Sequence, residues 1–196
     1  GRGAEMSAMA GLSEPHQGHT LDERWLARVR IGVLAAGFAI VGVAAGGIFD
    51  RPDWTLVVGP LVPAMVAALL VGRPSLARIA GAATSVLLAV VITVVVAGGS
   101  AGDVVRSFSS GFQGLLSTDW PSPVRADLLG TVAAALATAC ALSAEIVARR
   151  RFHLLGVLPL VLAYLGVVAL SAPLGAQWWC LVGVAATSTA LALLRN

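Results

Sequence analysis

Two ionisable residues in the second half of the chain have a spacing that lets them act together. Glu145 precedes Arg149 by four residues, so both side chains share one face of a helix. A carboxylate inside an apolar helix is costly and often marks a proton or ion site. The adjacent Arg150 and Arg151 favour another interpretation, in which Glu145 and Arg149 form a salt bridge at the membrane surface.

Three further polar residues lie in or beside apolar segments. Tyr164 is expected in the middle of a helix, where its hydroxyl needs a partner and either lines a cavity or packs structurally. Asp127 is expected near a helix N-terminus, where the helix dipole favours a carboxylate. His153 has no credible metal-ligating partner, since His16 and His19 belong to the N-terminal tail. The sequence therefore predicts neither a metal site nor a cofactor.

The two cysteines are expected at different depths. Cys140 lies ~21 Å along its apolar segment from the outer edge and Cys180 only ~5 Å, at 1.5 Å per helical residue. Bridged cysteines need Cα atoms within ~7 Å, so two free thiols are predicted. Neither cysteine has a histidine nearby in sequence, and the chain has no phosphate-binding loop, HExxH motif or nucleophile elbow. No catalytic residue is therefore assigned.

The composition identifies the elements that position these residues. The chain has 196 residues, is 58% hydrophobic and only 12% charged, and has a mean hydropathy of +0.88. These values exclude a disordered chain, a coiled coil and a disulfide-rich secreted domain, and they argue against a soluble enzyme. Each membrane span needs ~20 apolar residues, so six spans fit this length. The fold class predicted is an all-α, polytopic transmembrane helix bundle.

The domain organisation predicted is a short tail followed by one membrane domain. Residues 1–20 are small and polar and are expected to form a disordered tail, and residues 21–196 form the six-span domain. Gly42 and Gly46 in the first span form a small-residue motif that lets another helix approach closely. The six spans are expected at residues 29–49, 54–72, 76–97, 125–148, 152–171 and 175–194.

The arginines predict the orientation in the plasma membrane. All 13 basic residues are Arg, and they lie at the ends of apolar runs, so they indicate topology and not nucleic-acid binding. A cytoplasmic N-terminus places ten of them inside and three outside, so both termini are predicted inside. The inner ten are Arg2, Arg24, Arg28, Arg30, Arg73, Arg78, Arg149, Arg150, Arg151 and Arg195, and the outer three are Arg51, Arg106 and Arg125.

The loop between the third and fourth spans contains an amphipathic pattern. Residues 103–116 are predicted to form one helix that is too short to span and lies in the outer membrane interface. Phe108 and Phe112 are the aromatic residues of its apolar face, which is expected to rest on lipid and on the neighbouring spans. The apolar positions are Val104, Val105, Phe108, Phe112, Leu115 and Leu116.

The second half of the chain resembles a known family. The resemblance rests on the amphipathic outer helix, WPSP at 120–123, the arginines at 149–151, LLGVLPL at 154–160, Ala172-Pro173 and Trp178-Trp179. This pattern, over about 103–194, is similar to the multi-span N-terminal domain of TgpA-type transglutaminase-like membrane proteins, particularly actinobacterial ones. The absence of Lys and the many Ala, Val and Gly residues are typical of GC-rich coding and agree with such a source.

The resemblance implies a role in the cell envelope. In that family an extracytoplasmic transglutaminase-like domain with a Cys-His-Asp triad follows the membrane domain, and a cytoplasmic MoxR-type AAA+ ATPase is often encoded nearby. The chain is then expected to be the membrane anchor or scaffold module alone, with the bilayer and an extracytoplasmic domain as partners. Two alternatives remain open: a small accessory subunit of a larger membrane complex, and a transporter or flippase for an apolar or lipid substrate.

Overall fold

The computed structural model describes residues 17–50, 53–118, 122–148, 153–171 and 178–194, and within these ranges the regular structure is helical. The long helices are α2 (Gln17–Gly46), α3 (Val58–Leu69), α4 (Ser75–Val96), α7 (Ala126–Ala148), α8 (Leu158–Ser171) and α9 (Trp178–Leu193). Two shorter helices, α5 (Ala101–Ser109) and α6 (Gly111–Ser117), and two 3-10 turns, η1 (Trp54–Val57) and η2 (His153–Val157), complete the set.

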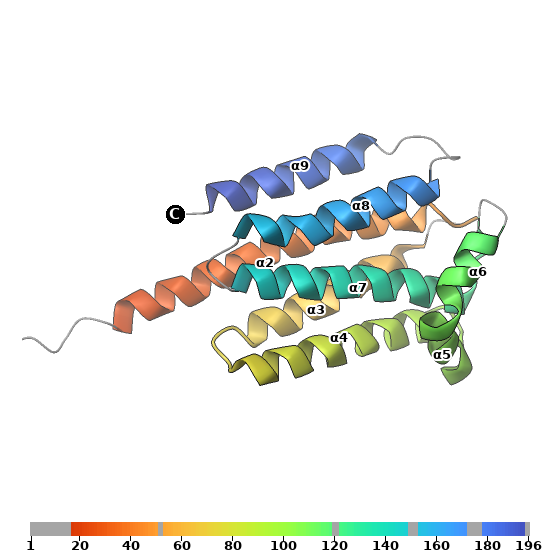
Figure 1. Ribbon diagram of the computed structural model, residues 1–196, viewed down its shortest axis with the longest axis horizontal. Coiled ribbons are helices and arrows are strands. Elements are labelled where there is room, and N and C mark those ends of the chain that lie inside the picture. The colour runs from red at the N-terminus through yellow and green to blue at the C-terminus, as the bar shows by residue number, and fades with distance from the viewer. Residues whose placement is uncertain (1–16, 51–52, 119–121, 149–152, 172–177, 195–196) are drawn as a thin grey trace, which may run out of the picture.

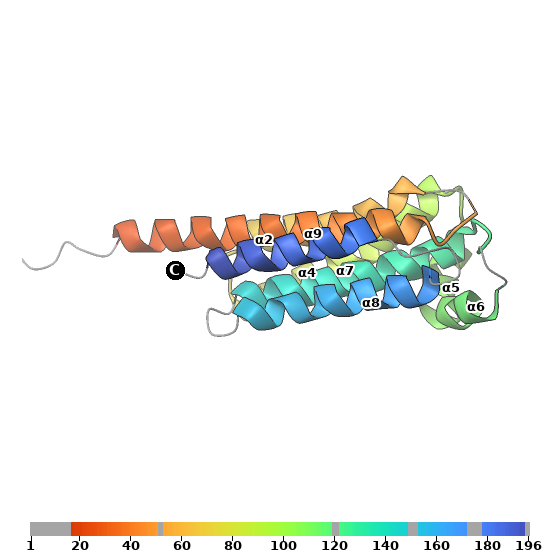
Figure 2. The same cartoon turned by 90° about the horizontal axis from the view of Figure 1, so that it is seen from above.

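The six long helices lie side by side along the long axis of the molecule, and α5 and α6 lie across one end of the bundle (Figures 1 and 2). The start of α2 and the end of α9 lie at the opposite end, which also holds the α3–α4 turn (Figure 1). We call the end with α5 and α6 the capped end and the other the terminal end. The first turns of α2 project past the other helices at the terminal end (Figure 2).

Three helices are long and apolar enough to cross a membrane: Glu23–Gly46, Ser75–Val96 and Ala126–Ala148. The apolar stretches Trp54–Leu69, Leu155–Ser171 and Trp178–Leu193 are shorter. Within the described residues the structure thus confirms a helical, strongly apolar fold that fits a membrane protein. A helix overlaps each of the six predicted segments, although α2 begins 12 residues before its segment, and three of these helices are long enough to cross a membrane.

Helix α7 lies in the interior of the bundle and contacts α2, α3, α4, α5, α6 and α8. Its buried residues include Leu129, Leu136 and Ala144, which pack with Phe38 and Val41 of α2 in one continuous core. In a bilayer such packing is stabilised by van der Waals contacts and not by the hydrophobic effect, because lipid tails are as apolar as these side chains. Helix α4, in contrast, exposes apolar side chains along its outer face, as a lipid-facing helix does.

The small residues of α2 permit a close backbone approach. A Cβ on Gly42 would lie 2.9 Å from the carbonyl oxygen of Leu56, and one on Gly46 would lie 2.6 Å from that of Asp53. The close approach that the sequence predicted for this motif therefore occurs, and the element that approaches is η1 with the residue before it.

Two predicted boundaries differ from the structure. Helix α2 begins at Gln17, inside the segment assigned to the tail, whereas residues 1–16 lie outside the described ranges. The single helix predicted over 103–116 is instead two helices, because the chain leaves helical geometry at Ser110, which has φ −134° and ψ −3°. The break lets α6 change direction after α5 (Figure 1).

Candidate functional site

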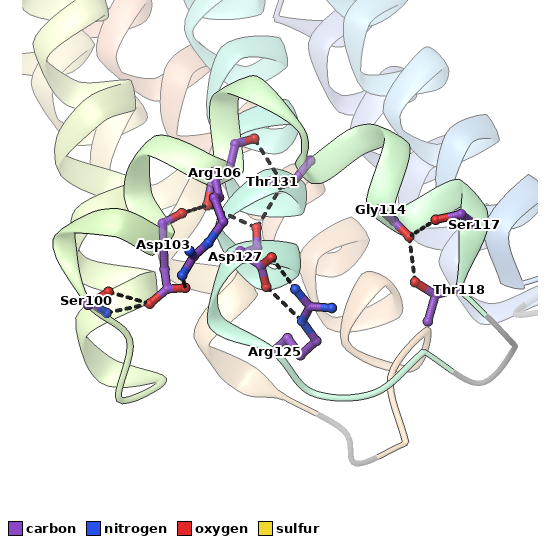
Figure 3. Close-up of polar contacts among 10 residues, drawn as sticks. Ser100, Asp103, Arg106, Gly114, Ser117, Thr118, Arg125, Asp127 and Thr131 are labelled. Carbon is purple, nitrogen blue, oxygen red and sulfur yellow. Dashed lines mark hydrogen bonds and ion pairs between the residues drawn. The ribbon is translucent and has the colours of Figure 1, made fainter.

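At the capped end, side-chain hydrogen bonds stabilise the first turn of α5. The backbone N–H of Ser100 donates to Asp103 Oδ2 at 2.7 Å and the Ser100 side chain accepts from the Asp103 N–H, which together form a capping box. The Ser100 hydroxyl also donates to Asp103 Oδ2 at 2.8 Å. Arg106 donates to the other carboxylate oxygen of Asp103 at 2.5 Å (Figure 3). The Arg106 guanidinium and the Ser100 donors hold the pKa of Asp103 well below its usual range, and the pKa of Arg106 is raised in return.

Polar contacts tie α5 to the start of α7. The Ser107 hydroxyl donates to the carbonyl oxygen of Asp127 at 3.0 Å, and the Thr131 hydroxyl lies 3.0 Å from the carbonyl oxygen of Ser107 (Figure 3). Glycines make this approach possible: a Cβ on Gly130 would clash with the Ser107 hydroxyl, and one on Gly111 would clash with that of Thr131. We call α5 and α6 together the cap. Small and polar residues therefore fix the cap to the bundle.

The first turn of α7 carries an ion pair beside this contact. Arg125 donates to the two carboxylate oxygens of Asp127 at 3.1 and 2.7 Å. Asp127 is buried and belongs to the first turn of α7, as the sequence predicted, where the helix dipole also favours its charge. Arg125 itself remains exposed, so the ion pair lies at the surface of the capped end.

The apolar face of the cap points away from the bundle. Phe108 and Phe112 are 54% and 65% exposed, and Val105 and Leu116 are exposed as well. Of the six apolar positions predicted for this face, Leu115 is buried, packing in the core with residues of α7, and Val104 is half-buried. Leu115 thus rests on the neighbouring helices, whereas Phe108 and Phe112 leave more than half of their surface free, and Ser107 and Gly111 form the buried side against α7.

At the terminal end, Glu145 has a partner that sequence spacing did not suggest. Arg78 in the first turn of α4 lies 3.2 Å from Glu145 Oε1, and both side chains are about one-fifth exposed, at 21% and 23%. Arg149 lies outside the described residues, so the predicted Glu145–Arg149 pair is untested. Arg78 is 67 positions before Glu145, and no local spacing rule connects residues at that distance.

A small cavity adjoins this ion pair. It has a volume of about 20 Å³, enough for about one water molecule. Helices α2, α3, α4 and α7 line it with apolar residues such as Ile31 and Pro63, and Arg78 and Glu145 supply its polar side. Arg78 Nε is buried there and makes no hydrogen bond within the described part of the chain.

The remaining candidates take structural positions. Tyr164 is half-buried and packs against the core, the second of its two predicted roles. Cys140 and Cys180 are buried free thiols, as predicted, and Cys140 donates to the carbonyl oxygen of Pro60 at 3.3 Å. Within the described ranges, no group of three or more His, Cys, Asp or Glu residues is arranged to hold a metal ion.

Comparison with known proteins does not assign a family. No protein-family model, no curated protein and no solved structure matches the chain.

Proposed function

We propose that the chain is a six-span module of the plasma membrane, with both termini in the cytoplasm, that anchors and positions a transglutaminase-like protein of the cell envelope. The observation that carries the proposal is the bundle of apolar helices with α5 and α6 across one end (Figure 1). Hydrogen bonds attach these two short helices to α7, and they expose Phe108 and Phe112. Such an arrangement suits a rigid scaffold, since the polar contacts of the cap are directed into the bundle and its apolar side chains outward.

Exposed tryptophans support membrane crossing by the shorter helices. Trp54 and Trp178, at the starts of η1 and α9, are 69% and 71% exposed and lie towards the capped end. Tryptophan favours the headgroup region of a bilayer, so these residues mark one membrane surface. A 16-residue helical stretch such as Trp54–Leu69 spans ~24 Å, and local thinning of the bilayer accommodates that length at modest cost.

Charge supports the orientation. Among the described residues, Arg24, Arg28, Arg30, Arg73 and Arg78 belong to segments at the terminal end, whereas Arg106 and Arg125 belong to the capped end. Short cytoplasmic segments carry the excess of arginine, so the terminal end with both chain ends faces the cytoplasm. The α5–α6 cap then lies in the outer interface, with Phe108 and Phe112 facing lipid.

Cysteine accessibility tests this topology. Ser75 and Ser100 are exposed at opposite ends of α4, and the buried Cys140 and Cys180 can be replaced by Ala to leave a single reactive thiol. A membrane-impermeant reagent applied outside intact cells should label Ser100→Cys and not Ser75→Cys. Labelling of Ser75→Cys from outside contradicts the proposed orientation.

The lipid-facing cap has its own test. Phe108→Asp should move the cap out of the interface, because a charged side chain is unfavourable at the acyl boundary. An environment-sensitive fluorophore at Ser109→Cys, in the same cysteine-free background, should then report a more polar surrounding in reconstituted vesicles. An unchanged signal together with loss of binding to an extracytoplasmic protein identifies the cap as a protein-docking surface and contradicts the lipid assignment.

The nucleotide sequence that follows the codon for Asn196 tests the anchoring role. A reading frame that continues past Asn196 into a domain with Cys, His and Asp supports the anchor for a transglutaminase-like protein, which the resemblance of residues 103–194 implies. A stop codon directly after Asn196 favours an accessory subunit or a transporter, and it leaves the topology experiment as an independent result.

A further inference from the structure

Arginines from two separate segments converge at the terminal end. Arg24 and Arg28 are one turn apart on α2, and both lie against the last turn of α3. The guanidinium of Arg24 lies over Gly72, where a Cβ would be 3.2 Å from Arg24 Nε, and Arg28 Nε donates to the carbonyl oxygen of Ala68 at 3.4 Å. Arg73 follows Gly72 in the α3–α4 turn. We call Arg24, Arg28 and Arg73 the arginine cluster.

The conformation of Gly72 in the α3–α4 turn leaves room for the Arg24 side chain of this cluster. Gly72 has φ +87°, a conformation that residues with a side chain rarely adopt, and its lack of a Cβ leaves the space that the Arg24 guanidinium occupies. All three arginines are exposed, and the side chains of Arg24 and Arg73 make no hydrogen bond or ion pair with other described residues. Glu145, the acidic residue near the end of α7, is paired with Arg78. Asp22 and Glu23 directly precede Arg24, so the three guanidinium groups of the cluster exceed the neighbouring carboxylates by one formal charge.

Exposed apolar residues flank the α3–α4 turn that carries Arg73. Leu69 precedes the α3–α4 turn and is 71% exposed, and Leu76 follows it and is 80% exposed. Ile79, one turn further along α4, is also exposed. Trp25, beside Arg24 on α2, is exposed in the same region, and tryptophan is enriched at the level of lipid headgroups. The turn with Gly72 and Arg73 lies at the tip of the α3–α4 pair, and Leu69, Leu76 and Ile79 belong to the helical turns next to it. This order matches that of the phosphate and the acyl chains of a phospholipid.

We propose that the arginine cluster binds the phosphate of an anionic phospholipid in the inner leaflet, with the acyl chains of that lipid against Leu69, Leu76 and Ile79. The proposal rests on the cytoplasmic placement of the terminal end given above. Guanidinium groups bind phosphate oxygens through charge-assisted hydrogen bonds, and three of them complement a headgroup that carries net negative charge. A lipid, and not a soluble phosphate, is the ligand because exposed apolar residues flank the turn that carries Arg73.

Lipid titration of the purified chain in detergent tests the proposal. Native mass spectrometry should detect binding of phosphatidylglycerol and much weaker binding of phosphatidylcholine. Each arginine near an anionic headgroup contributes about fivefold in affinity, so Arg24→Gln/Arg28→Gln/Arg73→Gln should weaken phosphatidylglycerol binding by roughly 100-fold. The matched control is Arg106→Gln/Arg125→Gln at the capped end, which should bind the lipid as the unaltered chain does.

The outcomes separate this site from the proposed topology. Equal phosphatidylglycerol binding by the triple variant and the unaltered chain overturns the lipid site, even when cysteine labelling places Ser75 inside. Equally tight binding of soluble glycerol phosphate by the unaltered chain also overturns it, because the apolar residues beside the turn are then not part of the site. Circular dichroism of the triple variant should be unchanged, since its three side chains are exposed; a loss of helicity that accompanies the loss of binding contradicts a direct role for the cluster.

Discussion

Arg78 and Glu145 form a charge pair between two long helices, α4 and α7. The other ion pairs among the described residues, Asp103–Arg106 and Arg125–Asp127, each join residues two or three positions apart in the chain. A pair between helices resists separation of the helices only when both charges are present. Loss of one partner leaves the other charge poorly solvated beside an apolar cavity.

We therefore expect strong coupling in a double-mutant cycle. Glu145→Gln alone should lower the free energy of unfolding by about 1–3 kcal/mol, between the values for exposed and buried pairs. Arg78→Gln/Glu145→Gln should cost less than the sum of the two single changes, because it leaves no uncompensated charge. Unfolding by denaturant in detergent, measured for all four proteins of the cycle, checks this. Strictly additive costs would mean that the pair contributes nothing to stability.

We expect the cap to lose stability at low pH, because protonation of Asp103 weakens its contacts with Arg106 and Ser100. Its pKa lies below the usual value because Arg106 and the Ser100 donors stabilise the carboxylate. A lowered pKa contributes stability that is present above the ordinary aspartate pKa of about 4 and is lost progressively as the pH falls below it. A fluorophore at Ser109→Cys should change its emission below pH ~4. Asp103→Asn should show the low-pH signal already at pH 7 and should lose the pH dependence.

The sequence could identify some of these residues and not others. Asp127 near a helix start and the capping pattern at Ser100 and Asp103 follow from local rules, since the partners are close in the chain. The partner of Glu145 could not be predicted, because it depends on how α4 and α7 cross. Helical spacing could suggest only Arg149, four positions away, and that pair stays a prediction because Arg149 lies outside the described residues.

At the scale of elements, the cap shows what an amphipathic pattern does and does not specify. The pattern over 103–116 separates apolar from polar positions, and Phe108, Phe112 and Leu116 are indeed exposed. It does not specify that the cap packs on α7 through Ser107 and Gly111, nor that the helix ends at Ser109. Those features depend on Thr131 and Gly130 of α7, which are distant in sequence.

Gly130 should therefore control attachment of the cap. In Gly130→Ala the new methyl group would clash with the Ser107 hydroxyl and lie 2.8 Å from Val94 Cγ2. Overpacking of this kind costs ~1–3 kcal/mol and should displace α5 from α7. Amide hydrogen exchange of residues 101–117 should then become faster while that of α2 is unchanged.

Gly166→Ala is the matched control for this change. Gly166 lies in α8, and no atom lies within 4 Å of a Cβ built there. Alanine in a helix is more favourable than glycine by up to ~1 kcal/mol, so this variant should be as stable as the unaltered chain or more stable. If Gly130→Ala and Gly166→Ala have the same exchange rates over residues 101–117, the close contact does not hold the cap.

At the scale of the whole molecule, α9 has a peripheral position. It packs chiefly on α2, with further contacts to α8 and η2, and is not among the helices packed around α7 (Figure 2). The apolar runs of the sequence predicted that this helix exists, but hydropathy carries no information about its neighbours. Its place follows from residues that fit together only in the folded chain: Gly37 against Thr187, and Gly183 against Ile40.

A larger side chain at Gly37 should disrupt the contact between α2 and α9. A Cβ on Gly37 would lie 2.7 Å from Thr187 Cγ2 and 3.1 Å from Leu160 Cδ2, so Gly37→Leu should force α9 away from α2. Gly32→Leu is the control on the same helix, because no atom lies within 4 Å of a Cβ there. Hydrogen exchange in nanodiscs should accelerate across 178–193 in Gly37→Leu alone.

Arg30 of α2 should limit how far α9 moves away from α2 in Gly37→Leu. Its guanidinium donates to the carbonyl oxygen of Leu194 at 3.0 and 2.5 Å and should keep the end of α9 attached to α2. Exchange should therefore rise most in the half of α9 that begins at Trp178, and Gly37→Leu/Arg30→Gln should extend the increase to Leu193. Uniform acceleration across α9 in Gly37→Leu would show that Arg30 does not hold this end, and equal exchange in Gly37→Leu and Gly32→Leu would show that the glycine contact does not position the helix.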